Sequence, residues 1–306
     1  MGPITPQNDE RAFTYLVGIG VTHSVAPPMH DFIARSLGYD WKFLAQECPS
    51  VEDAVALFRK PSFAGGVVTM PYKTSIMQHL DGLDEYATTI GACNNVYRAA
   101  DGSLRGTNTD WRGIKGCLLQ GDPQGEGKGK PALIIGAGGA SRAALFALHD
   151  QLQSNPIYVV NRDRAEVDAL VKDAQAYDGR VQIIHLRSVD EAKALPAPYY
   201  IVGTVPDFEP KSPEEIAARD VVEHFLSSSA EKGVLLDMCF KPRRTRYLKL
   251  GEKHGWKTVE GVNIIGHQIQ EQYRLWAGEK ASERINTKGA WEVLLQAADK
   301  SPAINF

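Results

Sequence analysis

Six polar residues stand directly after apolar runs in the first part of the chain, and their types suit the binding of a hydroxylated molecule. They are Ser24 in VTHSVAPPMH, Thr69 and Lys73 in VVTMPYK, Asn94 in GACNN, and Asn108 with Asp110 in RGTNTDWRG. In α/β proteins such positions are the ends of strands, which present their side chains to a crevice. The pattern therefore indicates a ligand site in the N-terminal part of the chain.

A second candidate site is a glycine-rich turn between the apolar run PALII and a helical pattern. It comprises Gly136, Ala137, Gly138, Gly139, Ala140 and Ser141, read as GAGGAS. Glycines remove Cβ atoms where a pyrophosphate must approach the backbone, and the following helix directs its free N–H groups and positive dipole end at that phosphate. This context of strand, turn and helix predicts a dinucleotide-binding fold.

The next strand ends in VVNRDRAE, where the choice between two cofactors is usually made. An acid at this point binds the ribose 2′-hydroxyl of NAD, whereas an arginine accommodates the 2′-phosphate of NADP. Arg162 and Arg164 could clamp a phosphate, Asn161 adds a neutral donor, and Asp163 would instead serve a hydroxyl. We expect NADP rather than NAD; the alternative is that both arginines belong to a solvated helix start.

Short β-rich runs alternate with amphipathic stretches from residue 14 onward, which predicts a largely parallel, helix-covered sheet. In the first half, we expect strands at 14–20, 39–46 and 63–70, helices at 27–38, 51–60 and 72–80, and a hairpin over 92–106 turned at Asp101-Gly102. The glycine-rich, charged stretch 121–131 predicts an exposed connection.

A second α/β run follows this connection. We expect strands at 131–138, 156–162, 180–186, 199–205 and 233–240, helices at 141–152 and 164–175, and only helices after residue 261. These last helices need an apolar partner. The fold class is therefore α/β, with a substrate-binding domain at 1–112, a Rossmann domain at 113–261 and C-terminal helices at 262–306 that return to the first domain.

Composition excludes several classes of protein. The 306 residues are 43% hydrophobic and 23% charged, with a formal net charge of −3. A nucleic-acid binder usually carries a basic excess, and no apolar run approaches the roughly 18 residues of a membrane-spanning helix. Four widely spaced cysteines without a CxxC pair predict a reduced, cytoplasmic chain without a metal site.

Taken together, the motifs resemble the shikimate dehydrogenase and quinate dehydrogenase family. The resemblance covers nearly the whole chain, from GIGVTHSVAPPMH through VTMPYK, GACNN, GTNTDWRG, GAGGAS, NR and DMCFKPRRT to GVNIIGHQ. It implies the fold described above and an NAD(P)-dependent oxidoreductase that interconverts a ring secondary alcohol and a ketone. The expected partner is a cyclic hydroxy acid or polyol, and the chain is expected to be a monomer or a homodimer.

The same resemblance implies roles for individual residues. Lys73 would be the catalytic base and Asp110 its partner, which suits alcohol oxidation because a positioned base removes the hydroxyl proton as hydride leaves. Ser24, Thr69, Asn94 and Gln268 would bind substrate, whereas Met238, Gly261 and Glu85 would lie on the cofactor side. Taken alone, Asn94 could instead cap a turn and Gln268 could sit on an exposed helix face.

The chain departs from the family pattern chiefly where the substrate carboxylate would be held. Ala26 and Phe240 replace a serine and a tyrosine, which removes two hydroxyls from that end. Further departures are Val67, Asn95, the pair Ile264-Ile265 and the segment IVGTVP. We therefore expect altered specificity, toward quinate or a related polyol. The alternatives are a non-catalytic sensor of a dinucleotide or metabolite on this fold, or a relative that reduces another cyclic carbonyl.

Overall fold

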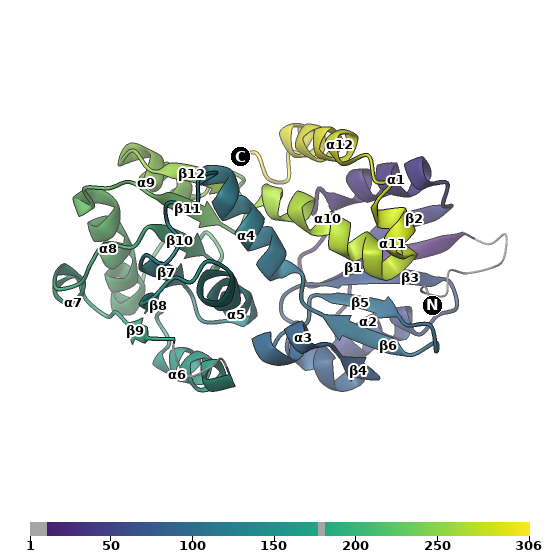
Figure 1. Cartoon of the computed structure of the whole chain (residues 1–306), viewed down its shortest axis with the longest axis horizontal. Helices are drawn as coiled ribbons and strands as arrows, with labels where there is room; N and C mark the ends of the chain where they lie inside the picture. Colours follow the sequence, from purple (N-terminus) through teal and green to yellow (C-terminus); the bar gives the residue numbers. More distant parts are fainter. Residues whose placement is uncertain (1–10, 177–180) are drawn as a thin grey trace. The chain divides into compact units, whose positions relative to one another are not determined.

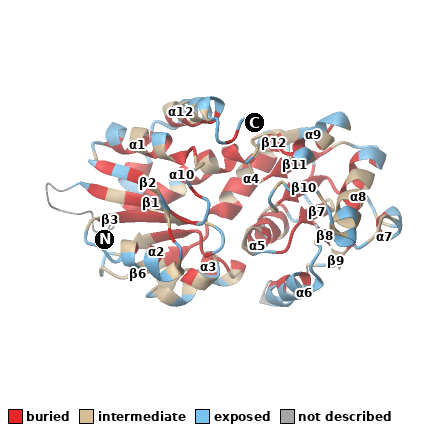
Figure 2. Ribbon diagram, turned by 180° about the vertical axis from the view of Figure 1, so that it is seen from behind, coloured by how far each residue is buried: buried red, intermediate tan, exposed pale blue. Residues whose placement is uncertain are grey.

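A computed structural model describes residues 11–176 and 181–306 of the chain (Figure 1). The chain divides into two compact units, and each has its own sheet. Unit 1 comprises the residues up to Thr109 together with Ile265–Ile304, and unit 2 comprises Asp110–Ile264 with the last two residues. In each unit, buried residues run along the strands while the exposed residues lie on the outer faces of the helices (Figure 2).

Unit 1 is a mixed sheet of six strands in the order β2-β1-β3-β5-β6-β4. The strands are β1 (Ala12–Gly18), β2 (Trp41–Glu47), β3 (Phe63–Val68), β4 (Gly82–Leu83), β5 (Asn95–Arg98) and β6 (Leu104–Thr107). The helices are α1 (Ala26–Leu37), α2 (Val51–Phe58), the 3₁₀ helix η1 (Ser75–His79), α3 (Glu85–Ile90), most of α10 (Val262–Ala277), α11 (Glu279–Ser282) and α12 (Thr287–Lys300). Strands β5 and β6 form the expected hairpin.

The C-terminal helices pack on the N-terminal sheet, as the fold class predicts. Trp276 of α10 donates its indole N–H to the carbonyl of Val96 at 3.2 Å, and the Tyr273 hydroxyl donates to the carbonyl of His30 at 3.0 Å. A Cβ built on Gly65 of β3 would lie 2.4 Å from the Trp276 ring. Glycine at position 65 therefore lets α10 approach the sheet.

Gly65→Ala is expected to lower the free energy of unfolding by about 1–3 kcal/mol or more, because its methyl group has no space beside a buried indole. Urea unfolding followed by circular dichroism measures the loss. In a Trp276→Leu background the same substitution should be less destabilising, because the two positions are in contact. Equal losses in both backgrounds would contradict the packing argument.

Unit 2 is a fully parallel sheet in the order β12-β11-β10-β7-β8-β9, the strand order of a Rossmann fold. Its strands are β7 (Ala132–Ile135), β8 (Ile157–Val160), β9 (Ile183–His185), β10 (Tyr200–Gly203), β11 (Val234–Asp237) and β12 (Lys257–Glu260). The helices are α4 (Asp110–Gly121), α5 (Gly139–Phe146) with its π-helical extension η2 (Ala147–Gln151), α6 (Arg164–Asp173) followed by the 3₁₀ turn η3 (Ala174–Ala176), α7 (Val189–Lys193), α8 (Pro213–Ser228) and α9 (Arg246–Lys253). The first residue of the strand expected over 180–186 lies outside the described residues.

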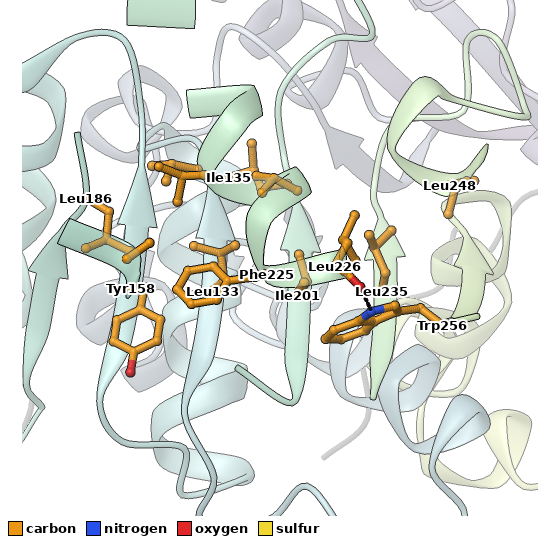
Figure 3. Close-up of a cluster of buried hydrophobic side chains, with 14 residues drawn as sticks. Leu133, Ile135, Tyr158, Leu186, Ile201, Phe225, Leu226, Leu235, Leu248 and Trp256 are labelled. Atoms are coloured by element: carbon orange, nitrogen blue, oxygen red, sulfur yellow. Dashed lines mark hydrogen bonds between the residues drawn. The ribbon is translucent and has the colours of Figure 1, made fainter. Parts of the chain in front are cut away.

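One face of this sheet forms an apolar core with α7, α8 and α9 (Figure 3). Tyr158 and Phe225 stack with their ring centroids 5.6 Å apart, and Trp256 donates its indole N–H to the carbonyl of Leu226 at 3.0 Å. Alternate residues of each buried strand face this core, as Leu133 and Ile135 do in β7. Because both faces of the sheet are covered, the four central strands β7, β8, β10 and β11 are buried along their whole length rather than at alternate residues.

The helix expected over residues 72–80 is wrong. The segment forms turns and the short 3₁₀ helix η1. The Lys73 carbonyl accepts a hydrogen bond from the backbone N–H of Cys93 at 2.7 Å, so it is engaged outside its own segment. This link ties Lys73 to the chain that leads into β5.

The connection over residues 121–131 is only partly exposed, contrary to expectation. Asp122 is 1% exposed and accepts hydrogen bonds from the backbone N–H groups of Glu126 and Gly127 and from the Tyr200 hydroxyl, the last at 2.6 Å. Glycine-rich composition predicted a connection between the two α/β runs. It could not reveal that one carboxylate organises that connection against β10.

Candidate active site

The polar residues of unit 1 converge on one edge of its sheet. Strands β1, β2 and β3 are parallel, β5 runs antiparallel to β3, and β6 runs antiparallel to β5. The carboxyl ends of β1, β3 and β6 therefore meet the amino end of β5 at the same edge. The residues expected there follow or precede these ends: Ser24, Thr69, Lys73, Asn94 and Asn108.

A buried amide network occupies this edge. The backbone N–H of Thr109 donates to Asn94 Oδ1 at 2.6 Å, and the Thr109 hydroxyl donates to Gln268 Oε1 at 2.6 Å. Asn94 Nδ2 lies 3.1 Å from both Thr109 Oγ1 and Gln268 Oε1, and Gln272 Nε2 donates to the same Gln268 oxygen at 3.2 Å. These contacts fix both amides: each turns its carbonyl oxygen into the protein.

Gln268 therefore does not lie on an exposed face of α10, because it is 5% exposed and bonded to residues 174 and 159 positions earlier in the chain. Asn94 is 1% exposed. Both belong to the network. Asn108 stabilises the same edge, because its Nδ2 donates at 2.8 Å to the carbonyl of Ala92 in the segment before β5.

Lys73 and Thr69 lie on the segment that leaves β3. The backbone N–H of Thr69 donates to the carbonyl of Val17 at 2.9 Å, which continues the β1–β3 ladder past the last strand residue. A Cβ on Gly18 would lie 2.5 Å from Thr69 Cγ2. Thr69 is thus packed against the end of β1, and the Lys73 side chain is half-buried.

Ser24 lies in the loop between β1 and α1, which the Glu47 carboxylate holds. Glu47 accepts backbone N–H bonds from Gly20 at 2.7 Å, Val21 at 2.6 Å and Thr22 at 3.2 Å. Partial burial alone would raise the pKa of Glu47, but these three bonds and the His23 charge lower it. The Ser24 hydroxyl oxygen accepts the N–H of Ala26 at 3.3 Å, so its hydrogen remains a donor.

Glu47→Gln is expected to lower the melting temperature at neutral pH, because an amide accepts these three bonds less strongly than a carboxylate. A carboxyl group whose pKa is lowered on folding stabilises the protein above its unfolded pKa, and this stabilisation is lost as the pH falls. The difference between the two proteins should therefore shrink below pH 4.5, the ordinary value for glutamate. Thermal unfolding at several pH values tests this, with Glu52→Gln on α2 as control; a pH-independent difference would contradict it.

Two further candidates have simpler surroundings. Asp110 is the first residue of α4 in unit 2 and is 5% exposed, directly after Thr109 in the chain. The positive end of the helix dipole favours a carboxylate at this position. Glu85 is exposed at the first turn of α3.

Asn95, one of the departures from the family pattern, is fully buried. Neither its Nδ2 nor its Oδ1 has a hydrogen-bond partner in the described structure.

In unit 2 the glycine turn connects β7 to α5, at the point where the strand order reverses between β7 and β10. Gly136 has φ +114°, and a Cβ there would lie 2.4 Å from Thr204 Oγ1, so only glycine fits. Gly138 is exposed, and a Cβ on it would meet nothing within 4 Å. The turn is therefore tight on its inner side and open on its outer side, and it fits a pyrophosphate at the N-terminus of α5.

The residues after β8 divide into two groups. The Asp163 carboxylate caps α6 by accepting the N–H of Ala165 at 2.8 Å and that of Glu166 at 3.4 Å. Arg162 and Arg164 extend outward, with side chains 68% and 74% exposed, and pair with surface carboxylates of Glu215 and Asp168. Asn161 Nδ2 bonds Glu166 at 2.8 Å.

Met238 and Phe240 lie in the loop after β11 and are half-buried, whereas Gly261 is buried after β12. A Cβ on Gly261 would lie 2.3 Å from the carbonyl oxygen of Met238. The loop therefore packs directly on the backbone of residue 261. In unit 2 these positions share the carboxyl edge of the sheet with the glycine turn.

Sequence reasoning missed two residues of unit 1 that organise this edge. Thr109 lies between two residues that were singled out in GTNTDWRG, and its place there was the only available signal. Glu47 ends an amphipathic strand, where nothing in the sequence distinguishes it from a solvent-exposed carboxylate.

Within residues 11–176 and 181–306, no group of three or more His, Cys, Asp or Glu side chains could hold a metal ion. Over the same ranges, none of the helices is both long and apolar enough to cross a membrane.

Comparison with known proteins bears on these sites. Residues 16–96 match the family model described as the shikimate dehydrogenase substrate binding domain. The chain is 37% identical over 301 residues to a quinate dehydrogenase of Emericella nidulans, covering 91% of this chain and 92% of that protein. It is 34% identical over 288 residues to a pentafunctional AROM polypeptide of Schizosaccharomyces japonicus, covering 91% of this chain but 17% of that protein.

Among solved structures, the shikimate 5-dehydrogenase of Thermus thermophilus in complex with NADP(H) and shikimate superposes with a TM-score of 0.73 at 27% identity. The match covers 94% of this chain and 99% of that one. It extends through both units, and the resemblance expected from the motifs is confirmed. The chain belongs to the shikimate and quinate dehydrogenase family, oxidoreductases that act on CH–OH groups.

Proposed function

We propose that this dehydrogenase uses NADP and acts on quinate, or on a related cyclic polyol acid, in preference to shikimate. The observation that carries the proposal is the contrast between the two ends of the expected substrate site. The hydroxyl-binding amides Asn94 and Gln268 are held rigidly by Thr109. The carboxylate end has Ala26 and Phe240 where the family has hydroxyl side chains.

Lys73 is the proton acceptor in this proposal. Oxidation removes a hydride from the carbinol carbon, and a bound nicotinamide dinucleotide supplies the acceptor for it. The ring hydroxyl must lose its proton in the same step, and the Lys73 amine takes that proton onto Nζ. Asp110 compensates the resulting charge and orients the ammonium group. In the reverse direction Lys73 returns the proton to the developing alkoxide.

Helix α1 supports the change at the carboxylate end. The N-terminus of a helix binds anions through its free N–H groups, but Pro27 and Pro28 occupy the first turn of α1 and have no N–H. The Ala26 N–H already donates to Ser24 Oγ. Carboxylate recognition by this loop therefore depends on the Ser24 hydroxyl. A substrate with an additional hydroxyl at that carbon gains the space at Ala26.

The position of Asp163 at the N-terminus of α6 favours NADP over NAD. Its carboxylate caps α6 through Oδ1, which orients the residue best suited to bind a ribose 2′-hydroxyl toward its own helix. Arg162 and Arg164 are exposed and engaged only in surface ion pairs, which are worth about 1 kcal/mol or less. A doubly charged 2′-phosphate offers these guanidinium groups stronger, charge-assisted hydrogen bonds.

The test measures kcat/KM for quinate and for shikimate, each with NADP and with NAD. The wild-type protein is compared with the variants Arg162→Ala and Arg164→Ala. We expect quinate with NADP to be the best pair. Each arginine variant should raise KM for NADP by about tenfold or more, because a hydrogen bond to a charged group contributes roughly 1.5–3 kcal/mol. KM for NAD should change little. Lys130→Ala, at the opposite edge of the unit 2 sheet, is the control.

Equal or better turnover of shikimate would refute the substrate assignment. Preference for NAD, unaffected by the two arginines, would refute the cofactor assignment.

A further inference from the structure

Asp237, the last residue of β11, is a buried carboxyl group that the proposed mechanism does not use. It is 1% exposed. The Thr245 hydroxyl donates to its Oδ2 at 2.7 Å, and the backbone N–H of Cys239 donates to its Oδ1 at 3.2 Å. Thr245 in turn is the N-cap of α9 and accepts the N–H of Leu248. One carboxyl group thus ties both ends of the loop 238–244.

The backbone at this point is closely packed on two sides. A Cβ on Gly203 would lie 2.9 Å from Asp237 Oδ1, and a Cβ on Gly261 would lie 2.6 Å from the Asp237 carbonyl oxygen. The N–H of Met238 donates to the Gly203 carbonyl at 2.8 Å. The peptide that joins Asp237 to Met238 is therefore wedged between the ends of β10 and β12, so a change in the Asp237 bonds acts on Met238 directly.

No cation pairs with Asp237 in the described structure. Its charged neighbour is Asp207, between β10 and α8, whose carboxylate accepts the N–H of Arg246 at 3.1 Å and lies 3.4 Å from that guanidinium group. Tyr247 of α9 also faces it, and burial together with the charges of Asp237 and Asp207 raises the pKa of Tyr247 to about 12. Burial, which is the larger cause, and the charge of Asp207 together raise the pKa of Asp237 to about 7, although its two hydrogen bonds act in the opposite direction.

We propose that Asp237 is a positioning residue of the dehydrogenase: with Thr245 it holds the loop 238–244 in the conformation that presents Met238 to the dinucleotide. This proposal rests on the proposed function. When Asp237 is ionised, both loop contacts are charge-assisted and strong. When it is protonated, its hydroxyl donates to Thr245 Oγ1, the contact reverses, and both bonds become neutral. The stronger, charge-assisted bonds do not offset the cost of burying the charge, because burial raises the pKa of Asp237; the loop is therefore held most firmly while Asp237 is protonated, and less firmly as the pH rises to about 7.

The decisive variant is Asp237→Asn, because an amide reproduces the protonated group. Asn can accept the Cys239 N–H and donate to Thr245, but it does not ionise. The ratio of KM for NADP in this variant to that in the wild type should be near one at about pH 6. It should fall about threefold to tenfold by about pH 8, because the wild-type carboxylate is then ionised in a buried site without a cation while the amide stays neutral, and one unit of pKa corresponds to a factor of about ten. The 2′-phosphate of NADP also titrates in this pH range. It changes KM by the same factor in the variant and in the wild type, so it cancels in the ratio of the two KM values.

Two threonine variants complete the experiment. Thr245→Val, which removes the hydroxyl, should raise KM for NADP at about pH 8, and Thr245→Ser should restore it. Thr287→Val on α12 of unit 1, whose hydroxyl bonds only weakly to the Ile285 carbonyl, is the matched control and should leave KM unchanged. Circular dichroism confirms folding of each variant.

Quenching of intrinsic fluorescence by NADP measures binding without turnover. A wild-type chain that binds no dinucleotide would refute the proposed function. A wild-type chain that binds and turns over, with a KM ratio constant across this pH range, would overturn the role of Asp237 alone.

Discussion

Lys73→Ala is expected to reduce kcat by about 10²–10⁴-fold, with a smaller change in KM. General base catalysis by a positioned side chain contributes this much, and Lys73 is the proton acceptor in the proposed mechanism. Stopped-flow measurement of NADPH formation at saturating quinate gives kcat for wild type and variant. Lys60→Ala, on the exposed turn after α2, is the control and should be neutral.

Lys73→Met and Lys73→Arg distinguish the loss of a base from the loss of a positive charge. Methionine preserves the length of the side chain without an amine, so it should be as inactive as alanine. Arginine keeps the charge but is not deprotonated in proteins, and it should therefore fail as a base. Substantial activity in Lys73→Arg would show that position 73 only supplies a positive charge, which would contradict the proton transfer assigned to it.

The sequence was sufficient to predict the fold because the strands of unit 2 are short apolar runs separated by clear helix starts. β7, β8, β10 and β11 all fall within their expected ranges. Elements without strong periodicity were missed. The two-residue strand β4 and the helix α3 depend on Asp84, which caps α3 and follows directly after β4. Asp84 also accepts the hydroxyl of Thr107 on β6, and a tertiary contact of this kind leaves no periodic pattern.

Residue types at strand ends predicted the candidate site, but the groups that orient them were not predictable. Asn94 and Gln268 are 174 residues apart in the chain, and Thr109 joins them through one hydroxyl. Glu47 acts on the loop of Ser24 from a neighbouring strand. Both residues act through pairings of distant segments, which only the folded chain brings together. Short motifs therefore indicate candidate binding residues, whereas the residues that orient them become visible only in the folded chain.

Ala26→Ser combined with Phe240→Tyr is expected to raise kcat/KM for shikimate by about a hundredfold or more. Each restored hydroxyl can donate one hydrogen bond to the substrate carboxylate, and such a bond to a charged group contributes roughly 1.5–3 kcal/mol. The gain should appear mainly in KM, because the carboxylate end is remote from the carbon that is oxidised. Steady-state kinetics on both substrates measures it.

The single variants Ala26→Ser and Phe240→Tyr show which of the two positions changes the kcat/KM for shikimate. Ala26 is the first residue of α1 and is 5% exposed, so a serine hydroxyl introduced there is largely shielded from water. An unsatisfied buried hydroxyl is unfavourable in the free protein, and bound shikimate would relieve it. Ala26→Ser should therefore lower the melting temperature slightly and should also make it more responsive to shikimate. If the double variant gains nothing on shikimate while quinate turnover is unchanged, these two positions do not set specificity, and the amides of Asn94 and Gln268, which we propose to bind the substrate hydroxyls, become the next positions to test.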